Sequence, residues 1–258
     1  MYGLIVTASI LIAAWYAEKE LEFEKKDTEP MWAALLWVLV CGLIGARLFH
    51  VFDYWNYYLQ NPELIPQLWQ GGLGIFGGIA GGLAGLALFG RKNRLSRTEL
   101  LKLIDLGALV LPLGQFIGRW ANYFNQEVYG LPSTLPWAIY IPFDKRLDAV
   151  LGFDTFHPLF LYESLGALVI FFILFSLKHL LKKRVRLLDG DLLLVYLLTY
   201  GFLRFILEPL RIVHWGLGNF NVVSSLSLAL MIFSLLVLIF RKDGQNRETS
   251  DNTRTKIK

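Results

Sequence analysis

Residues 31–52 read MWAALLWVLVCGLIGARLFHVF, and this apolar run indicates the kind of fold that the chain adopts. As an α-helix it would be about 33 Å long, enough to cross the hydrocarbon core of a bilayer, which is about 30 Å thick. The whole chain has 258 residues, of which 55% are hydrophobic and 15% aromatic. Soluble domains are less apolar, and aromatic residues are typical of membrane–water interfaces. The sequence therefore predicts an all-α, polytopic membrane protein.

Short polar segments separate seven apolar runs, and each run is expected to be a transmembrane helix. The predicted spans cover residues 2–17, 31–52, 72–89, 100–117, 159–177, 192–207 and 222–240. No linker rich in Ser, Gly or Pro divides the sequence, which predicts a single seven-span bundle over residues 1–240. The polar residues 241–258 are expected to form a disordered cytoplasmic tail. Because no lysine or arginine precedes the first run, we do not expect it to be a signal peptide.

The distribution of lysine and arginine predicts the orientation of these spans. Nineteen of the 25 basic residues lie in or next to the loops after spans one, three and five, or in the tail, whereas residues 48–90 contain none. We therefore expect these loops and the C-terminus to face the cytoplasm, and the N-terminus to lie outside. The basic residues are scattered over several loops, so no nucleic-acid partner is expected.

Cysteine usage and the spacing of possible metal ligands exclude two kinds of site. Cys41 is the only cysteine in the sequence, so an internal disulfide is impossible, and we interpret Cys41 as a small apolar residue of a helix. His, Cys and Asp do not occur at the spacings of metal ligands, and neither a metal nor another cofactor is expected.

Two arginines lie at depths where a bilayer disfavours charge. Arg119 follows the fourth span and Arg204 lies inside the sixth. Ionisable groups in such places are costly and mark functional sites by default. The structural alternatives are an ion pair, for instance between Arg204 and Glu208 one turn later, and snorkelling to the outer headgroups. Clustering favours a site, because Tyr200, Arg204, Glu208 and Arg211 share one helical face.

Other polar residues are predicted to lie near the same end of the bundle. The segment GRWANYFNQEVYG, residues 118–130, contributes Asn122 and Asn125, and HPLFLYES, residues 157–164, contributes His157, Tyr162 and Glu163. Arginine binds phosphate through a planar, bidentate fork, and amides and hydroxyls can bind glycerol hydroxyls. The sequence therefore predicts a site for an anionic lipid headgroup in the outer half of the bilayer.

Glycine pairs recur in GGLGIFGGIAGGLAG, residues 71–85. Gly74, Gly78 and Gly82 form a stripe of small residues at helical spacing, which favours close packing against another helix. The alternative is that the glycine backbone makes room for a lipid.

Together these segments resemble the bacterial prolipoprotein diacylglyceryl transferases. GRWANYFNQEVYG is similar to the family signature, and HPLFLYE and YGFLRFILEPLR are similar to two further motifs, in the same order along the chain. The Tyr-Gly-Leu at residues 2–4 resembles the start of the family's first span. Phe76 departs from the pattern, since the family usually has a histidine there, and Gln70 replaces an acidic residue.

The resemblance implies a multi-pass enzyme of the bacterial cell membrane. Its expected partners are phosphatidylglycerol, membrane lipid and the signal peptides of preprolipoproteins. The cysteine thiol would attack the glycerol carbon that bears the phosphate ester, so that a thioether forms and glycerol 1-phosphate leaves. The rival hypotheses are a non-catalytic lipid-binding membrane protein and a transporter of small anions, although no inverted repeat supports the latter.

The resemblance also implies roles for individual residues. The expected catalytic residues are Arg119, Arg204, Tyr2, Glu127 and Glu208. The expected substrate-binding residues are Arg119, Asn122, Asn125, Tyr200, His157, Tyr162, Glu163, Gly77 and Gly78.

The group that accepts the thiol proton stays open, because Phe76 cannot take part in proton transfer. The alternatives are His157, Glu127, a phosphate oxygen or hydroxide helped by the positive field, or altered chemistry in this chain.

Overall fold

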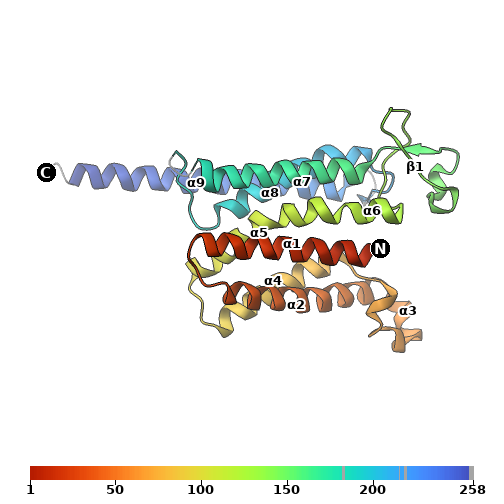
Figure 1. The fold of residues 1–258 in the computed structure, drawn as a ribbon, viewed down its shortest axis with the longest axis horizontal. Coiled ribbons are helices and arrows are strands. Elements are labelled where there is room, and N and C mark those ends of the chain that lie inside the picture. The colour runs from red at the N-terminus through yellow and green to blue at the C-terminus, as the bar shows by residue number, and fades with distance from the viewer. Residues whose placement is uncertain (182–183, 215, 218–219, 256–258) are drawn as a thin grey trace. The chain divides into compact units, whose positions relative to one another are not determined.

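The computed structural model describes residues 1–181, 184–214, 216–217 and 220–255. It contains a long helix over each of the seven predicted spans (Figure 1). These helices are α1 (Tyr2–Phe23), α2 (Glu29–Asp53), α4 (Ile75–Lys92), α5 (Arg97–Gly118), α7 (Leu159–Phe175), α8 (Asp191–Leu207) and α9 (Val222–Thr255). α9 continues past Phe240 to Thr255. The predicted boundary at residue 240, between a membrane domain and a disordered tail, therefore stays a prediction.

Five helical segments of the described chain are long and apolar enough to cross a membrane. They are Glu29–Asp53, Arg97–Asn125, Leu159–Leu180, Asp191–Leu210 and Val222–Lys242. α1 ends in a charged turn, EKELEF, and α4 is rich in glycine, which lowers the apolarity of both. The chain is thus a helical membrane protein with five such segments among the described residues. Seven crossings and their orientation stay predictions.

Short elements connect the long helices. They are α3 (Trp55–Gln60), α6 (Trp120–Asn125), the 3-10 turns η1 (Pro62–Leu64), η2 (Leu68–Gln70), η3 (Phe143–Lys145), η4 (Asp148–Val150) and η6 (Glu208–Leu210), and the π turn η5 (Ser176–Leu180). The all-α prediction did not include two antiparallel strand pairs. β1 (Ile139–Tyr140) pairs with β2 (Thr155–Phe156), and β3 (Gly216–Leu217) pairs with β4 (Phe220–Asn221). These strands lie in polar connections, where hydrophobic periodicity carries little signal.

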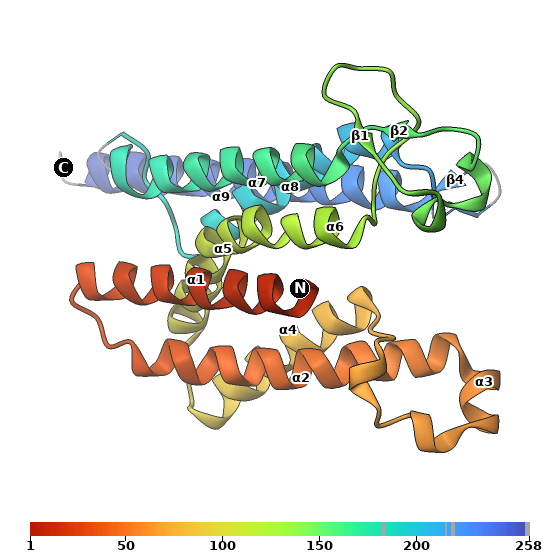
Figure 2. The ribbon, with the colours of Figure 1, turned by 45° about the vertical axis from the view of Figure 1, so that its right-hand side comes forward.

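The chain divides into two compact units, and the single bundle over residues 1–240 stays a prediction. The larger unit consists of residues 1–17 and 104–258, and the smaller one of residues 18–103. In the larger unit α8 packs against both α7 and α9, as Figures 1 and 2 show. Its core is a cluster of buried side chains comprising Ala108, Leu109, Ile170, Leu174, Leu192 and Tyr196. A second cluster, around Phe156 and Ile141, supports the β1–β2 pair.

Asp105 of α5 holds the first turn of α8. Its carboxylate accepts hydrogen bonds from the backbone N–H groups of Gly190, at 2.6 Å, and Leu193, at 3.0 Å. The first N–H groups of a helix have no partner within the helix, so this carboxylate satisfies two donors and also complements the helix dipole. Asp191 pairs in turn with Arg241 of α9 at 2.8 Å. These contacts fix the helix that carries Arg204.

In the smaller unit, α2 and α4 pack through their glycines. A Cβ atom at Gly77 would collide with the carbonyl oxygen of Gly45, and one at Gly81 with that of Cys41. At Gly78 it would meet the Ala46 methyl group at an ordinary 3.6 Å. The closest backbone approach therefore runs through Gly77 and Gly81, one position before the Gly78 and Gly82 of the predicted stripe. The interpretation as helix packing is confirmed, with its register corrected.

Arg47 stabilises the loop that leads into α4. Its guanidinium donates to the carbonyl oxygens of Ile65 at 2.8 Å, Gly71 at 2.8 Å and Gly72 at 3.0 Å, and also to that of Leu64. Buried carbonyl groups need such donors, so the buried Arg47 has a structural role.

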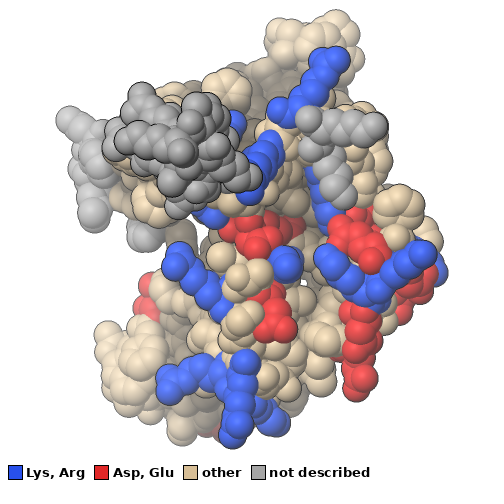
Figure 3. Space-filling view, turned by 90° about the vertical axis from the view of Figure 1, so that its left-hand side faces the viewer, with Lys and Arg blue, Asp and Glu red and all other residues tan. Residues whose placement is uncertain are grey.

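Figure 3 shows one face of the molecule, on which lysine and arginine side chains lie among aspartates and glutamates.

Candidate functional site

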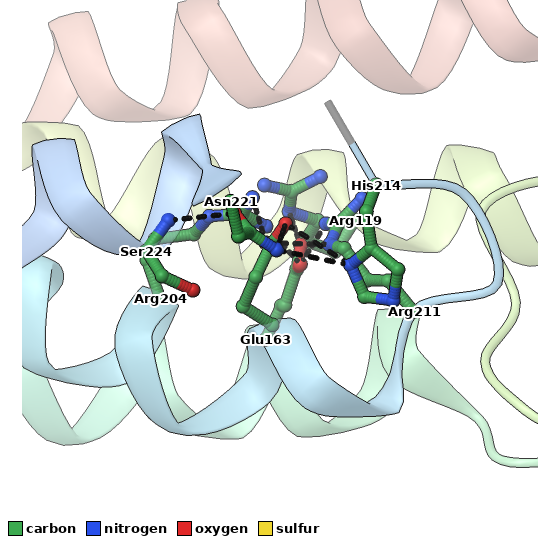
Figure 4. A network of polar contacts seen from close by, with 8 residues as sticks. Arg119, Glu163, Arg204, Arg211, His214, Asn221 and Ser224 are labelled. Atoms are coloured by element: carbon green, nitrogen blue, oxygen red, sulfur yellow. Dashed lines mark hydrogen bonds and ion pairs between the residues drawn. The ribbon is translucent and has the colours of Figure 1, made fainter. Parts of the chain in front are cut away.

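Three arginines of the larger unit converge on Glu163, in the second turn of α7 (Figure 4). Arg119 Nε lies 2.6 Å from Glu163 Oε2. Arg204 Nη1 donates to Glu163 Oε1 at 3.0 Å, and Arg211 Nη2 donates to the same oxygen. These contacts join the start of α6, the last turn of α8 and the residue after η6 to one carboxylate. Arg119 and Arg204 therefore share a single site.

A second carboxylate, Glu208, completes the cluster. Its Oε2 accepts a hydrogen bond from Arg204 Nη2 at 2.9 Å and lies 3.7 Å from Arg211 Nε. The Glu163 and Glu208 side chains are only 3% and 2% exposed, whereas those of Arg119, Arg204 and Arg211 are 25%, 15% and 19% exposed. The carboxylates therefore form the floor of the cluster, and the guanidinium groups remain accessible above them.

The charges of this cluster do not cancel. Three guanidinium groups face two carboxylates, which leaves one positive charge. An uncompensated charge near a low-dielectric interior is costly. A single phosphodiester would neutralise the cluster and could accept hydrogen bonds from the arginine forks. The arrangement is therefore suited to bind an anion of one negative charge.

The signature segment reaches the cluster through a break in the helix. α5 ends at Gly118, and Arg119 is the N-cap of the short α6. Asn122 is buried and donates to Glu127 Oε1 at 3.0 Å, while Gln126 turns the chain with a left-handed φ of 56°. Among the described contacts, Glu127 thus meets Asn122 rather than an arginine. Its expected catalytic role stays a prediction.

Gly130 explains how Arg211 reaches the same place. It forms an antiparallel bridge with Arg211, and its N–H donates to the carbonyl oxygen of His157 at 2.9 Å. A Cβ atom at Gly130 would lie 2.8 Å from the carbonyl oxygen of Leu210, so this position requires glycine. The end of the signature segment, the start of α7 and the segment after α8 are thereby tied together.

His157 and Tyr162 form a separate polar chain. Trp137 Nε1 donates to the Tyr162 hydroxyl at 2.8 Å, and that hydroxyl lies 3.3 Å from His157 Nδ1. In the described part of the molecule, no contact links the His157 or Tyr162 side chain directly to the three arginines. Both residues closely precede Glu163 in the sequence, but their side chains lie in a different polar environment.

Five other predicted residues are not brought into the cluster by any described contact. Tyr2 is the first residue of α1 and is 42% exposed, and Tyr200 stacks on Tyr196 with ring centroids 5.5 Å apart. Gly77 and Gly78 belong to the smaller unit, where they face α2. Asn125, at the end of α6, lines the cavity described below.

Three residues of the network were not among the expected catalytic or substrate-binding residues. Arg211 shared the helical face of Arg204 and Glu208, a signal that could have identified it. Asn221 Nδ2 lies 3.4 Å from Glu208 Oε1 and 3.2 Å from His214 Nδ1, while His214 Nδ1 lies 3.6 Å from Glu208 Oε1. Neither Asn221 nor His214 belongs to a recognisable spacing, so only the fold reveals them.

A cavity of about 730 Å³ adjoins the cluster at Arg211. Its walls come from the end of α6, the signature segment, the η3 region and the residues after η6. The lining residues are Phe124–Tyr129, Asp144–Leu147 and Arg211–Val213. Among the residues that the structure describes, no group of three or more His, Cys, Asp or Glu side chains could hold a metal ion.

Comparison with known proteins agrees with this geometry. The family model for prolipoprotein diacylglyceryl transferase matches residues 1–240, which include the whole arginine cluster. The chain belongs to the prolipoprotein diacylglyceryl transferase family. Two relatives of this transferase family, each named phosphatidylglycerol–prolipoprotein diacylglyceryl transferase, come from Nostoc sp. and Fervidobacterium nodosum. Both are 37% identical to this chain. The match to the Nostoc protein covers 93% of this chain and 86% of that protein, and the match to the Fervidobacterium protein covers 89% of this chain and 77% of that protein.

Proposed function

We propose that this chain transfers the diacylglyceryl group of phosphatidylglycerol to the lipobox cysteine of a preprolipoprotein, the first step of lipoprotein maturation. The observation that carries the proposal is the convergence of Arg119, Arg204 and Arg211 on two buried glutamates. The names of the relatives support this substrate pair. A multi-pass position in the bacterial cell membrane, with seven spans and the cluster toward the outer leaflet, belongs to the same proposal.

In this reaction the cysteine sulfur attacks the glycerol carbon that bears the phosphate ester. The new C–S bond forms as the C–O bond breaks, and the bonding electron pair leaves with the phosphate oxygen of glycerol 1-phosphate. Charge therefore grows on the phosphate in the transition state, where preorganised guanidinium groups stabilise it best. Glu163 and Glu208 hold these guanidinium groups in place. The family resemblance assigns the orientation of the headgroup to Asn122, Asn125 and Tyr2, although no described contact brings Asn125 or Tyr2 to the cluster.

The thiol must lose its proton, since the thiolate is the nucleophile and a free thiol has a pKa of about 8.5. Phe76 packs against Phe49 of α2 and supplies no acid–base group. His157 and Glu127 stay alternatives for the proton acceptor, together with a phosphate oxygen. The pH–rate profiles of His157→Ala and Glu127→Gln would separate these alternatives. In the variant that lacks the proton acceptor, the rate should rise only at a higher pH, where the thiol ionises without it.

An activity assay in lipid vesicles tests the proposed function. The purified protein is reconstituted with phosphatidylglycerol and given a lipobox peptide, and the diacylglyceryl thioether is detected by mass spectrometry. Arg119→Ala and Arg204→Ala are each expected to lower kcat by roughly 10²–10³-fold, the usual effect of removing one transition-state donor. Arg184→Ala, which removes an exposed arginine elsewhere in the same unit, is expected to leave kcat unchanged.

The rival hypotheses give different results in this assay. A lipid-binding protein would retain phosphatidylglycerol without forming a thioether, and a transporter would move a small anion across the vesicle membrane. Absence of the thioether with folded protein, or equal rates for Arg119→Ala and the wild type, would reject the transferase.

A further inference from the structure

The position of the cavity beside the arginine cluster bears on where a polypeptide acceptor could bind. Two apolar segments border it, because Arg97–Asn125 ends at its Asn125 wall and Asp191–Leu210 ends just before its Arg211 wall. Arg211 belongs both to the cluster and to the cavity lining. A chain held at the cluster by one cysteine can therefore continue directly into the cavity.

The walls of the cavity are rigidly built. The Tyr129 hydroxyl donates to the carbonyl oxygen of Lys145 at 3.1 Å and accepts a hydrogen bond from the Leu147 N–H at 2.7 Å. Arg146 donates to the carbonyl oxygen of Ile141 at 2.8 Å and lies 3.4 Å from Asp154. The backbone next to Tyr129 is strained, because Val128 has a left-handed φ of 56°. Such a conformation is unfavourable for a β-branched residue and is typical of functional sites.

The chemistry of the lining is mixed. Apolar side chains of Phe124, Leu147 and Val213 are 52%, 42% and 68% exposed. Carboxylates, a lysine and two amides lie between them, contributed by Glu127, Asp144, Lys145, Asn125 and Gln126. Glycerol 1-phosphate is small and wholly polar, so it does not account for the apolar surface. A polypeptide does, because it presents backbone donors and acceptors together with side chains of varied polarity.

We infer that this cavity binds the residues that follow the acceptor cysteine in the preprolipoprotein. The inference rests on the proposed function and identifies which part of the acceptor the enzyme contacts outside the bilayer. The lipid headgroup would bind at the arginine cluster, and the emerging polypeptide would bind in the adjoining cavity. The volume of about 730 Å³ lies within the range of ligand pockets and suits a short extended segment.

Two lipobox peptides test this inference in phosphatidylglycerol vesicles. One ends, amidated, at the acceptor cysteine, and the other continues for about six residues. Wild-type protein is expected to show a kcat/KM at least tenfold higher with the longer peptide. Leu147→Asp and Val213→Asp place a charge on the exposed cavity surface and are expected to reduce this ratio to about one. Phe153→Asp changes an exposed residue of the same region that does not line the cavity, and it should preserve the ratio.

Each outcome decides the question. A ratio near one in the wild type, or a ratio that survives both cavity substitutions, would overturn the cavity as the acceptor site while the transferase activity stands. Modification of neither peptide would reject the proposed function itself, and the inference with it.

Discussion

At the scale of single residues, Glu163 organises the site. Each of the three arginines contacts it, from positions that are 41 residues away for Arg204 and 48 for Arg211. Arginine forks are long and flexible, so a buried carboxylate is needed to aim them. Without it, three like charges would repel one another in an environment that screens them poorly.

The first prediction concerns the substitution Glu163→Gln. It preserves the shape of the side chain but removes its charge, and breaking a buried ion pair in this way costs roughly 3–5 kcal/mol. We expect kcat to fall by roughly 10²-fold or more and the thermal midpoint to drop. Vesicle kinetics and thermal unfolding measure the two effects.

Glu63→Gln is the matched control, since Glu63 is an exposed glutamate of the smaller unit. It should change neither quantity. If Glu163→Gln kept a rate within twofold of the wild type, Glu163 would not be the residue that aims the arginines.

At the scale of secondary structure, the α2–α4 pair depends on glycine. Helices approach this closely only where side chains are absent from the contact. The structure distinguishes two adjacent glycines there, because Gly77 faces the Gly45 carbonyl whereas Gly78 has room for a methyl group. Both glycines were predicted to bind substrate. Because only Gly77 lies at the close contact, substitutions at the two positions can distinguish a role in helix packing from a role in substrate binding.

The second prediction compares Gly77→Ala with Gly78→Ala. The first forces α4 away from α2 and should destabilise the protein by roughly 1–3 kcal/mol, as overpacking does. The second should leave stability within about 0.5 kcal/mol of the wild type. Thermal unfolding in detergent or vesicles provides the measurement. Equal stability of both variants would contradict the packing role of Gly77, and a loss of activity in stable Gly78→Ala would support a binding role for Gly78.

The helices themselves were predictable. Each long helix lies over an apolar run of the sequence, because hydrophobic length is a local property. The short elements were not predictable in the same way. The break between α5 and α6 at Arg119, and the β1–β2 pair in a polar connection, depend on tertiary contacts such as the Gly130–Arg211 bridge.

At the scale of the whole molecule, the open question is the number and direction of membrane crossings. The structure has a helix over every predicted span, and five segments of the described chain meet the requirements of length and apolarity. The positive-inside rule predicts that the last turn of α4 lies in the cytoplasm and the η4 region outside.

The third prediction tests that topology with single cysteines. In a Cys41→Ala background, Arg91→Cys and Asp148→Cys place a thiol on either side of one crossing, and both positions are exposed. A membrane-impermeant maleimide should label Asp148→Cys in right-side-out vesicles and Arg91→Cys in inverted vesicles. Cys41→Ala alone controls for background labelling. Labelling of both positions from the same side would contradict the predicted orientation.

Sequence alone was enough to locate the helices and to identify residue types that are suited to bind a phosphodiester. It could do so because apolar length, helical spacing and local motifs require no knowledge of distant contacts. The tertiary structure was needed to show that Arg204 and Arg211 both contact Glu163 and that Asn221 and His214 lie near Glu208. It was also needed to show that, among the described residues, no contact joins Glu127, Tyr200 or His157 to the guanidinium groups. A buried ion-pair network forms between side chains of different helices, so it depends on how those helices pack.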